Sequence, residues 1–150
     1  MSPLIRAAAL GLALTALAGC TSKAVLTPSR PLAADHSYSQ AQVQQAILMA
    51  VAERGWTARS ITAQRIQADI TVRNTFYAAV NIDYTPRDYR ISYRDSRGMD
   101  YADGKIHRNY NRWVKNLSGS ILRQLKTYDT QKLLLQQQQS LSQQSSDTLN

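Results

Sequence analysis

The sequence has a single cysteine among its 150 residues, and that residue is Cys20. One cysteine cannot form an intramolecular disulfide, so a disulfide-stapled scaffold is excluded. The chain also has no Gly-rich phosphate loop, no paired cysteines at metal-ligand spacing and no nucleophile elbow. Its extended apolar run, residues 7–18, is too short to span a bilayer as a helix. What remains is one small domain that depends on its hydrophobic core for stability.

The N-terminal segment has the layout of a secretory signal. Arg6 supplies a positive charge, residues 7–18 are apolar, and Leu17-Ala18-Gly19-Cys20 follows. This tetrapeptide resembles the lipobox of bacterial lipoproteins, in which small residues precede a cysteine whose thiolate accepts a diacylglyceryl group. An ordinary secretory signal with an incidental cysteine is the alternative. We expect residues 1–19 to be removed and Cys20 to be lipidated.

Lipidation at Cys20 determines where the protein is expected to reside. Cleavage leaves 131 residues, and the loss of Arg6 lowers the formal net charge from +8 to +7. Thr21, which is not Asp, follows the lipidated position, and by resemblance to the sorting rule of Gram-negative lipoproteins this favours the outer membrane. We therefore expect a lipid anchor with the domain facing the periplasm. The positive charge favours anionic lipids, glycolipid phosphates or an acidic protein surface, whereas export argues against nucleic acid.

Composition divides the rest of the chain into three parts. Residues 20–38 are rich in Ser, Thr, Pro and Ala without apolar periodicity, which predicts a flexible tether. A folded domain is expected over residues 39–128. Residues 129–150 are rich in Gln and Ser, a composition typical of a disordered tail, although Leu133 to Leu135 could prolong the preceding helix.

Hydrophobic periodicity predicts an α+β domain. Residues 40–54 have apolar residues at helical spacing, with Ser39 as N-cap and Gly55 as the C-terminal stop. Alternating patterns then predict four antiparallel strands, which lie near residues 56–61, 65–73, 76–84 and 89–94 with turns at 74–75 and 85–88. A second helix is expected from about residue 106, with an apolar stripe formed by Tyr110, Trp113, Val114, Leu117, Ile121, Leu125 and Tyr128. The order α-β-β-β-β-α indicates two layers, in which both helices cover one face of the sheet.

The outward face of the predicted sheet is the candidate binding surface. Alternation places five side chains with contact chemistry on this face: Arg65, Arg73, Tyr77, Arg90 and Arg94. Arginine makes bidentate contacts with phosphates and carboxylates, so an anionic glycolipid or an acidic envelope protein would fit. The alternative is a solvated face on which these arginines pair with aspartates of neighbouring strands.

His107 is the other candidate site, because it is the only histidine of the predicted domain. Asp100, Tyr101, Asp103 and Tyr110 lie near it in the sequence. Such a cluster could form an acid–base or metal site of a small envelope enzyme. The simpler interpretation is that His107 braces the start of the second helix. A single histidine without a second ligand at fixed spacing favours the simpler interpretation, so we expect no cofactor and no metal.

Three stretches carry a resemblance to a known family. Arg54-Gly55-Trp56, Tyr89 to Ser96 and Ile106 to Leu117 resemble a family of small proteobacterial lipoproteins of unassigned function, over roughly residues 40–126. The resemblance implies an exported α+β domain and supplies no catalytic residue. The expected function is therefore that of a lipid-anchored, non-enzymatic interaction module of the cell envelope.

Overall fold

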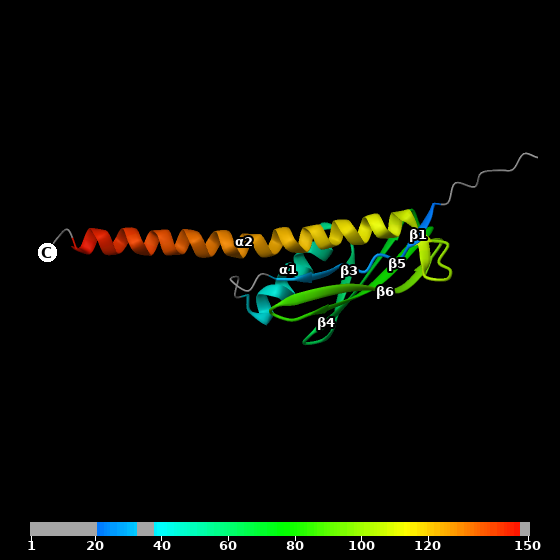
Figure 1. Cartoon of the computed structure of the whole chain (residues 1–150), viewed down its shortest axis with the longest axis horizontal. Coiled ribbons are helices and arrows are strands. Elements are labelled where there is room, and N and C mark those ends of the chain that lie inside the picture. The colour runs from blue at the N-terminus through cyan, green and yellow to red at the C-terminus, as the bar shows by residue number, and fades with distance from the viewer. Residues whose placement is uncertain (1–20, 33–37, 148–150) are drawn as a thin grey trace, which may run out of the picture.

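The computed structural model describes residues 21–32 and 38–147, so Cys20 lies outside the described residues. Two helices and seven strands form in these segments (Figure 1). In chain order they are β1 (Ser22–Ala24), β2 (Ser29–Pro31), α1 (Gln40–Glu53), β3 (Thr57–Thr62), β4 (Arg65–Val72), β5 (Phe76–Tyr84), β6 (Asp88–Arg97), β7 (Lys105–His107) and α2 (Arg108–Asp147). The predicted α+β class is confirmed. None of the described helices is both long enough and apolar enough to cross a bilayer.

The ends of α1 are fixed by local sequence. The Ser39 hydroxyl accepts from the Gln42 N–H at 3.1 Å, and the Gln42 side chain accepts from the Ser39 N–H at 2.8 Å. This capping box satisfies two backbone donors at the helix start. At the other end Gly55 has φ +73°, and the Trp56 N–H donates to the Val51 carbonyl at 2.9 Å, which is a Schellman stop. The predicted Ser39 cap and Gly55 stop are confirmed, and the helix ends at Glu53, one residue before the predicted end.

Five strands form one antiparallel sheet in the order β2-β6-β5-β4-β3. Ile82 pairs with Ile66 on β4 and with Ile91 on β6, so the alternation read from the sequence places apolar residues of three strands on one face. The turn between β4 and β5 begins one residue earlier than predicted. Its central residues are Arg73 and Asn74, both with φ 54°, as a primed hairpin turn requires.

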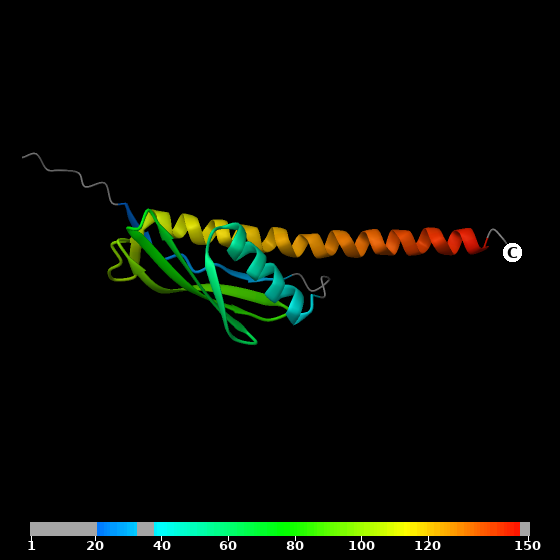
Figure 2. The ribbon, with the colours of Figure 1, turned by 180° about the vertical axis from the view of Figure 1, so that it is seen from behind.

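Both helices cover the same face of this sheet (Figures 1 and 2), and their buried residues form a single cluster with the inward strand residues. The predicted stripe of α2 is largely confirmed. Its fully buried members are Tyr110, Val114, Leu117, Ile121 and Leu125. The other two predicted members, Trp113 and Tyr128, are corrected, because they are only partly buried and pack against the margin of the core.

The prediction of a flexible tether over residues 20–38 is corrected by two short strands. β1 pairs with β7, and β2 pairs with β6 at the edge of the main sheet. Further backbone bonds extend the second contact, because the Leu32 N–H donates to the Arg87 carbonyl at 2.7 Å. These strands are held by backbone bonds while most of their side chains are exposed, so they produce no apolar periodicity in the sequence. Residues 33–37 lie outside the description.

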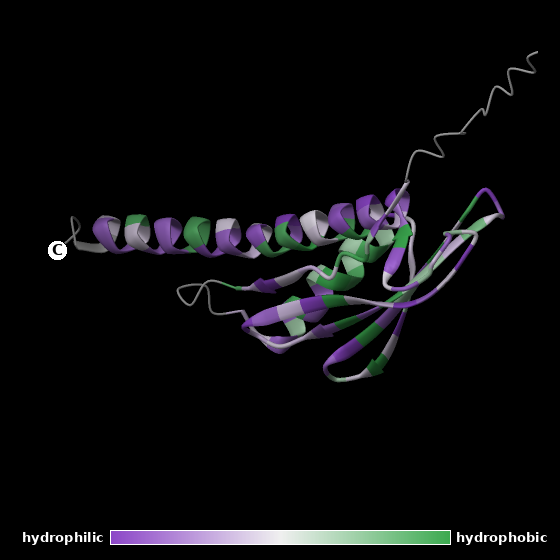
Figure 3. Cartoon of the chain, turned by 45° about the vertical axis from the view of Figure 1, so that its right-hand side comes forward, coloured by the Kyte–Doolittle hydropathy of each residue, from purple (hydrophilic) through white to green (hydrophobic). Residues whose placement is uncertain are grey.

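The prediction of a disordered tail over residues 129–150 is also corrected, since α2 continues to Asp147. Its C-terminal half projects beyond the sheet (Figures 1 and 3) and exposes Leu133, Leu134 and Leu135 by 59–66%. Gln, Leu and Lys have good helix propensity, and the packed half of α2 supplies the nucleus from which the helix extends. At 1.5 Å per residue, the 40 residues of α2 span about 60 Å.

Two glycines near the β1–β7 pair provide a matched stability test. Gly98 and Gly104 have φ +68° and +70°, but a Cβ at Gly98 would lie 2.6 Å from the Thr75 carbonyl oxygen, whereas one at Gly104 would meet nothing within 4 Å. Gly104→Ala should cost about 1 kcal/mol from backbone strain alone. Gly98→Ala should lower the free energy of unfolding clearly more than Gly104→Ala does, because the backbone of the β4–β5 turn must move to make room for the Cβ. Equal losses in urea unfolding would contradict this close approach.

Buried tyrosines predict a fall in stability at alkaline pH. Burial raises the pKa of Tyr110 well above its ordinary value of 10.0, and Tyr93 and Tyr101 raise it further. The unfolded chain therefore loses this proton first, so the stabilisation is complete below about pH 10 and is lost as pH rises above it. The Tyr110 hydroxyl also has no hydrogen-bond partner in the described structure.

Tyr110→Phe should therefore raise the free energy of unfolding by about 1 kcal/mol at neutral pH, because an unpaired hydroxyl is no longer buried. It should also reduce the loss of melting temperature above about pH 10. Tyr77→Phe, on the opposite face of the sheet, is the control. A variant whose alkaline profile matches that of the parent protein would contradict the assignment.

Candidate functional site

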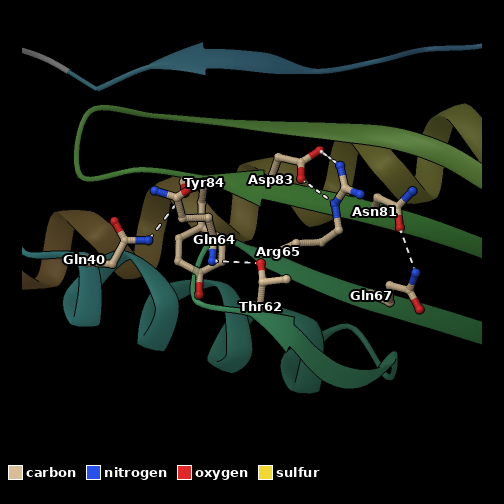
Figure 4. A network of polar contacts seen from close by, with 8 residues as sticks. All are labelled: Gln40, Thr62, Gln64, Arg65, Gln67, Asn81, Asp83 and Tyr84. Atoms are coloured by element: carbon tan, nitrogen blue, oxygen red, sulfur yellow. Dashed lines mark hydrogen bonds and ion pairs between the residues drawn. The ribbon is translucent and has the colours of Figure 1, made fainter.

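The outward face of the sheet is a ladder of polar pairs that satisfy one another (Figure 4). Arg65 makes two bonds to the Asp83 carboxylate, at 2.6 and 3.0 Å, and these bonds raise the pKa of Arg65. Gln67 donates to Asn81 at 3.2 Å on the next cross-strand pair. This part of the face follows the alternative interpretation, in which arginines and aspartates of neighbouring strands pair.

Arg90 shares this arrangement, although its side chain makes no hydrogen bond or ion pair with another described residue. It is exposed on β6, directly opposite Asp83, so Asp83 lies between Arg65 and Arg90 across three strands. One carboxylate thus faces two guanidinium groups. Such exposed pairs are screened by solvent and contribute little to stability. The structure brings Arg65 and Arg90 together, as predicted, around an acidic residue.

Tyr77 lies on the same face, near the start of β5, and is half-buried. The Arg97 guanidinium sits 4.5 Å from the centre of the Tyr77 ring, a cation–π contact between paired positions of β5 and β6. Arg97 lies beyond residue 94, where the last predicted strand ends, whereas β6 continues to Arg97. The alternation of apolar residues did not predict that Arg97 would contact Tyr77.

The structure corrects the positions of two predicted site residues. Arg73 is not on a strand, because β4 ends at Val72 and Arg73 occupies the following turn. Arg94 is the extra residue of a β-bulge, since Ala79 pairs with Asp95 and Val80 pairs with Tyr93. A bulge breaks the alternation, so Arg94 does not continue the row of Arg90.

Arg94 is also the least satisfied cation of the described structure. Its side chain is partly buried, and its Nε and Nη2 atoms are buried without a hydrogen-bond partner. Burial of an unpaired guanidinium is unfavourable, because lost hydration is not replaced by bonds within the protein. Arg94 is therefore a partly buried residue with two unsatisfied guanidinium nitrogens in the described structure, whereas Arg65 and Arg90 are exposed surface residues.

His107 braces the start of α2. It is the last residue of β7, it pairs with Ser22 of β1, and its Nδ1 atom accepts from the Asn109 N–H at 3.2 Å. Asp103 forms a tight turn with Gly104, in which both residues have positive φ. Across residues 21–32 and 38–147, no three His, Cys, Asp or Glu side chains gather in a way that would hold a metal ion.

An aromatic cluster lies beneath this junction. The rings of Tyr93 and Tyr101 stack with their centres 4.2 Å apart, and Tyr110 meets Tyr93 edge-on at 5.7 Å. Tyr101 and Tyr110 were candidates for a site around His107. They serve instead to pack the loop after β6 against the first turns of α2.

Sequence reasoning missed the way in which β1 is fastened to α2. The Arg108 N–H donates to the Thr21 carbonyl at 2.9 Å. The Asn111 side chain donates to the Ala24 carbonyl at 2.8 Å and accepts from the Leu26 N–H at 2.9 Å. Thr21 is therefore bonded to the first residue of α2, and no signal in the sequence distinguishes Asn111 from Asn109 of the same turn.

Two grooves flank α2 where it leaves the domain. One, of about 570 Å³, lies between Tyr38 at the start of α1 and Tyr128, Lys132 and Leu135 of α2. The other, of about 440 Å³, adjoins it and is lined by Leu32 and Leu122 among others. The Tyr38 hydroxyl donates to Asp129 at 2.7 Å between them. These grooves lie far along α2 from His107, and the candidate residues of the sheet face do not line them.

No family model and no curated protein matches this chain. The resemblance to small lipoproteins therefore stays a prediction, and the function is argued from the residues of this chain alone.

The bulge provides a test that separates the two arginines of β6. Arg94→Met should raise the free energy of unfolding by up to about 1 kcal/mol, because two guanidinium nitrogens that are buried without a partner are removed. Arg90→Met, at an exposed position, should stay within about ±0.5 kcal/mol. Urea unfolding of both variants measures the difference. A clear loss of stability in Arg94→Met would mean that this guanidinium has a partner in solution.

Proposed function

We propose that this protein is a lipid-anchored component of the bacterial envelope, attached through Cys20 to the outer membrane and facing the periplasm, where it acts as a non-enzymatic interaction module. The observation that carries the proposal is the Leu17-Ala18-Gly19-Cys20 tetrapeptide, which follows a charged and then apolar segment and contains the only cysteine of the chain. Several acyl chains make such an anchor effectively permanent, because each buried methylene contributes about 0.8 kcal/mol.

The arrangement of the described residues supports this proposal. Thr21, which follows Cys20 directly, is bonded to the start of α2 at one end of the molecule, and α2 then runs to the opposite end (Figure 2). A lipid at Cys20 would therefore hold the domain close to the membrane and leave the exposed half of α2 accessible to an envelope protein. The enzyme alternative centred on His107 has less support, because the Nδ1 atom of that residue accepts a backbone hydrogen bond.

Mass spectrometry tests the lipid attachment directly. In a Gram-negative host, the mature N-terminal peptide should begin at Cys20 and carry a diacylglyceryl group and an amide-linked acyl chain. Cys20→Ser should abolish the acyl mass and move the protein out of the membrane fraction, or leave it as uncleaved precursor. An unmodified N-terminal peptide from the parent protein would contradict the proposal.

Substitutions at Thr21, the residue after Cys20, test the expected sorting to the outer membrane. Thr21→Asp should keep the acyl group but retain the protein in the inner membrane, as the sorting rule implies, whereas Thr21→Ser should behave as the parent protein does. The contact that Thr21 makes with α2 uses its backbone carbonyl, so neither change removes it.

A further inference from the structure

The end of the molecule that carries β1 gathers much of the excess positive charge. We call residues 21–24, 73–76 and 97–112 the β1 end. Six cations lie there, and all are exposed: Lys23, Arg73, Arg97, Lys105, Arg108 and Arg112. The only acidic residues in these ranges are Asp100 and Asp103, so the β1 end has a formal charge of +4.

Strand pairing and backbone hydrogen bonds join these three ranges into one surface. β1 pairs with β7 over three residues, and the Thr21 carbonyl accepts from the Arg108 N–H. The His107 N–H donates to the Met99 carbonyl at 2.8 Å, which connects β7 to the end of β6. The β4–β5 turn adjoins the same place, because the Thr75 carbonyl packs against Gly98.

The lipidation site is attached directly to this surface. Cys20 is covalently bonded to Thr21, so their Cα atoms are about 3.8 Å apart. Thr21 in turn is fixed to the domain by its hydrogen bond to Arg108. An acyl group on Cys20 therefore leaves almost no free chain between the bilayer and the cations of the β1 end.

We propose that the β1 end is a docking surface for anionic phospholipid head groups, which orients the domain so that α2 stands away from the membrane. This inference rests on the proposed lipid anchor. Positive charge at a bilayer surface is attracted by the negative potential of anionic lipids within about one Debye length, roughly 8 Å at physiological salt. Because the anchor already confines the domain to the membrane, a weak attraction is enough to fix its orientation.

The direction of α2 determines how far its exposed half would lie from the membrane. The helix starts in the β1 end at Arg108 and continues for 40 residues along the long axis of the molecule (Figure 1). With the β1 end on the head groups, Gln138 would lie about 45 Å along the helix from its first residue. The exposed leucines Leu133, Leu134, Leu135 and Leu141 would then be presented well above the bilayer.

Fluorescence quenching by lipids spin-labelled in the head group tests this orientation. The lipidated protein has no other cysteine, so Ala102→Cys and Gln138→Cys each offer one thiol for a dye. Both positions are exposed, Ala102 in the β1 end and Gln138 on the projecting half of α2. In vesicles containing phosphatidylglycerol, the dye at residue 102 should be quenched several-fold more strongly than the dye at residue 138.

Charge-neutral variants test whether the cations cause this difference. Replacing Lys23, Lys105 and Arg108 by Gln should reduce quenching at residue 102 to the level that the parent protein shows in pure phosphatidylcholine. The matched control replaces Arg87, Lys126 and Lys132, which are exposed cations outside the β1 end. This control should quench as the parent protein does, and melting temperatures of both sets verify that the fold is retained.

The outcomes separate the two proposals. If the protein is acylated but its quenching changes neither with lipid charge nor with the three substitutions, the docking surface alone is overturned. Equal quenching at residues 102 and 138 has the same meaning. A protein without acyl chains that still floats with phosphatidylglycerol vesicles through the three cations overturns the lipid anchor and supports the docking surface. A protein that is neither acylated nor bound to these vesicles overturns both.

Discussion

The fold depends on the packing of the first half of α2 against the inward face of the sheet. Tyr110, Val114 and Leu117 are fully buried there with the apolar residues of β4, β5 and β6. Each buried large side chain contributes roughly 1.5–3 kcal/mol, so this helix supplies much of the core. α1 then closes the second layer, and the Arg54 guanidinium donates to the buried Ser120 hydroxyl at 2.6 Å to join the two helices.

Polar contacts elsewhere mostly fix direction and register. The Glu53 carboxylate accepts hydrogen bonds from Arg123 at 2.7 Å and from Gln124 at 3.2 Å. These two bonds lower the pKa of Glu53. The carboxylate therefore stays ionised further into the acidic range than an isolated one. On the opposite face of the sheet, the Arg65–Asp83 pair is consistent with the register that buries the apolar residues of β4 and β5. A one-residue slip would expose that whole row.

Much of the domain followed from the sequence, because its signals were local or periodic. Helix capping predicted the ends of α1 at Ser39 and Gly55. The alternation of apolar and polar residues predicted β4 and β5. The bulge at Arg94 did not follow, because it shifts the alternation only beyond Arg94, where the predicted strand already ended. β1 and β2 were missed because most of their side chains are exposed, so these strands leave no apolar alternation in the sequence. The candidate site was predicted least well, because residue spacing does not reveal which aspartate faces which arginine.

The fastening of β1 also determines how the molecule would carry a mechanical load. A pull on the chain at Thr21, directed along β1, would shear three paired positions and the Thr21–Arg108 bond together, because ladder hydrogen bonds lie across the strand direction. β7 leads directly into α2, so this force would pass into the long helix. From α2 the force would reach the five-stranded sheet only through the packed core. A pull at Thr21 would therefore be borne first by the β1–β7 pair, before it acted on the register of that sheet.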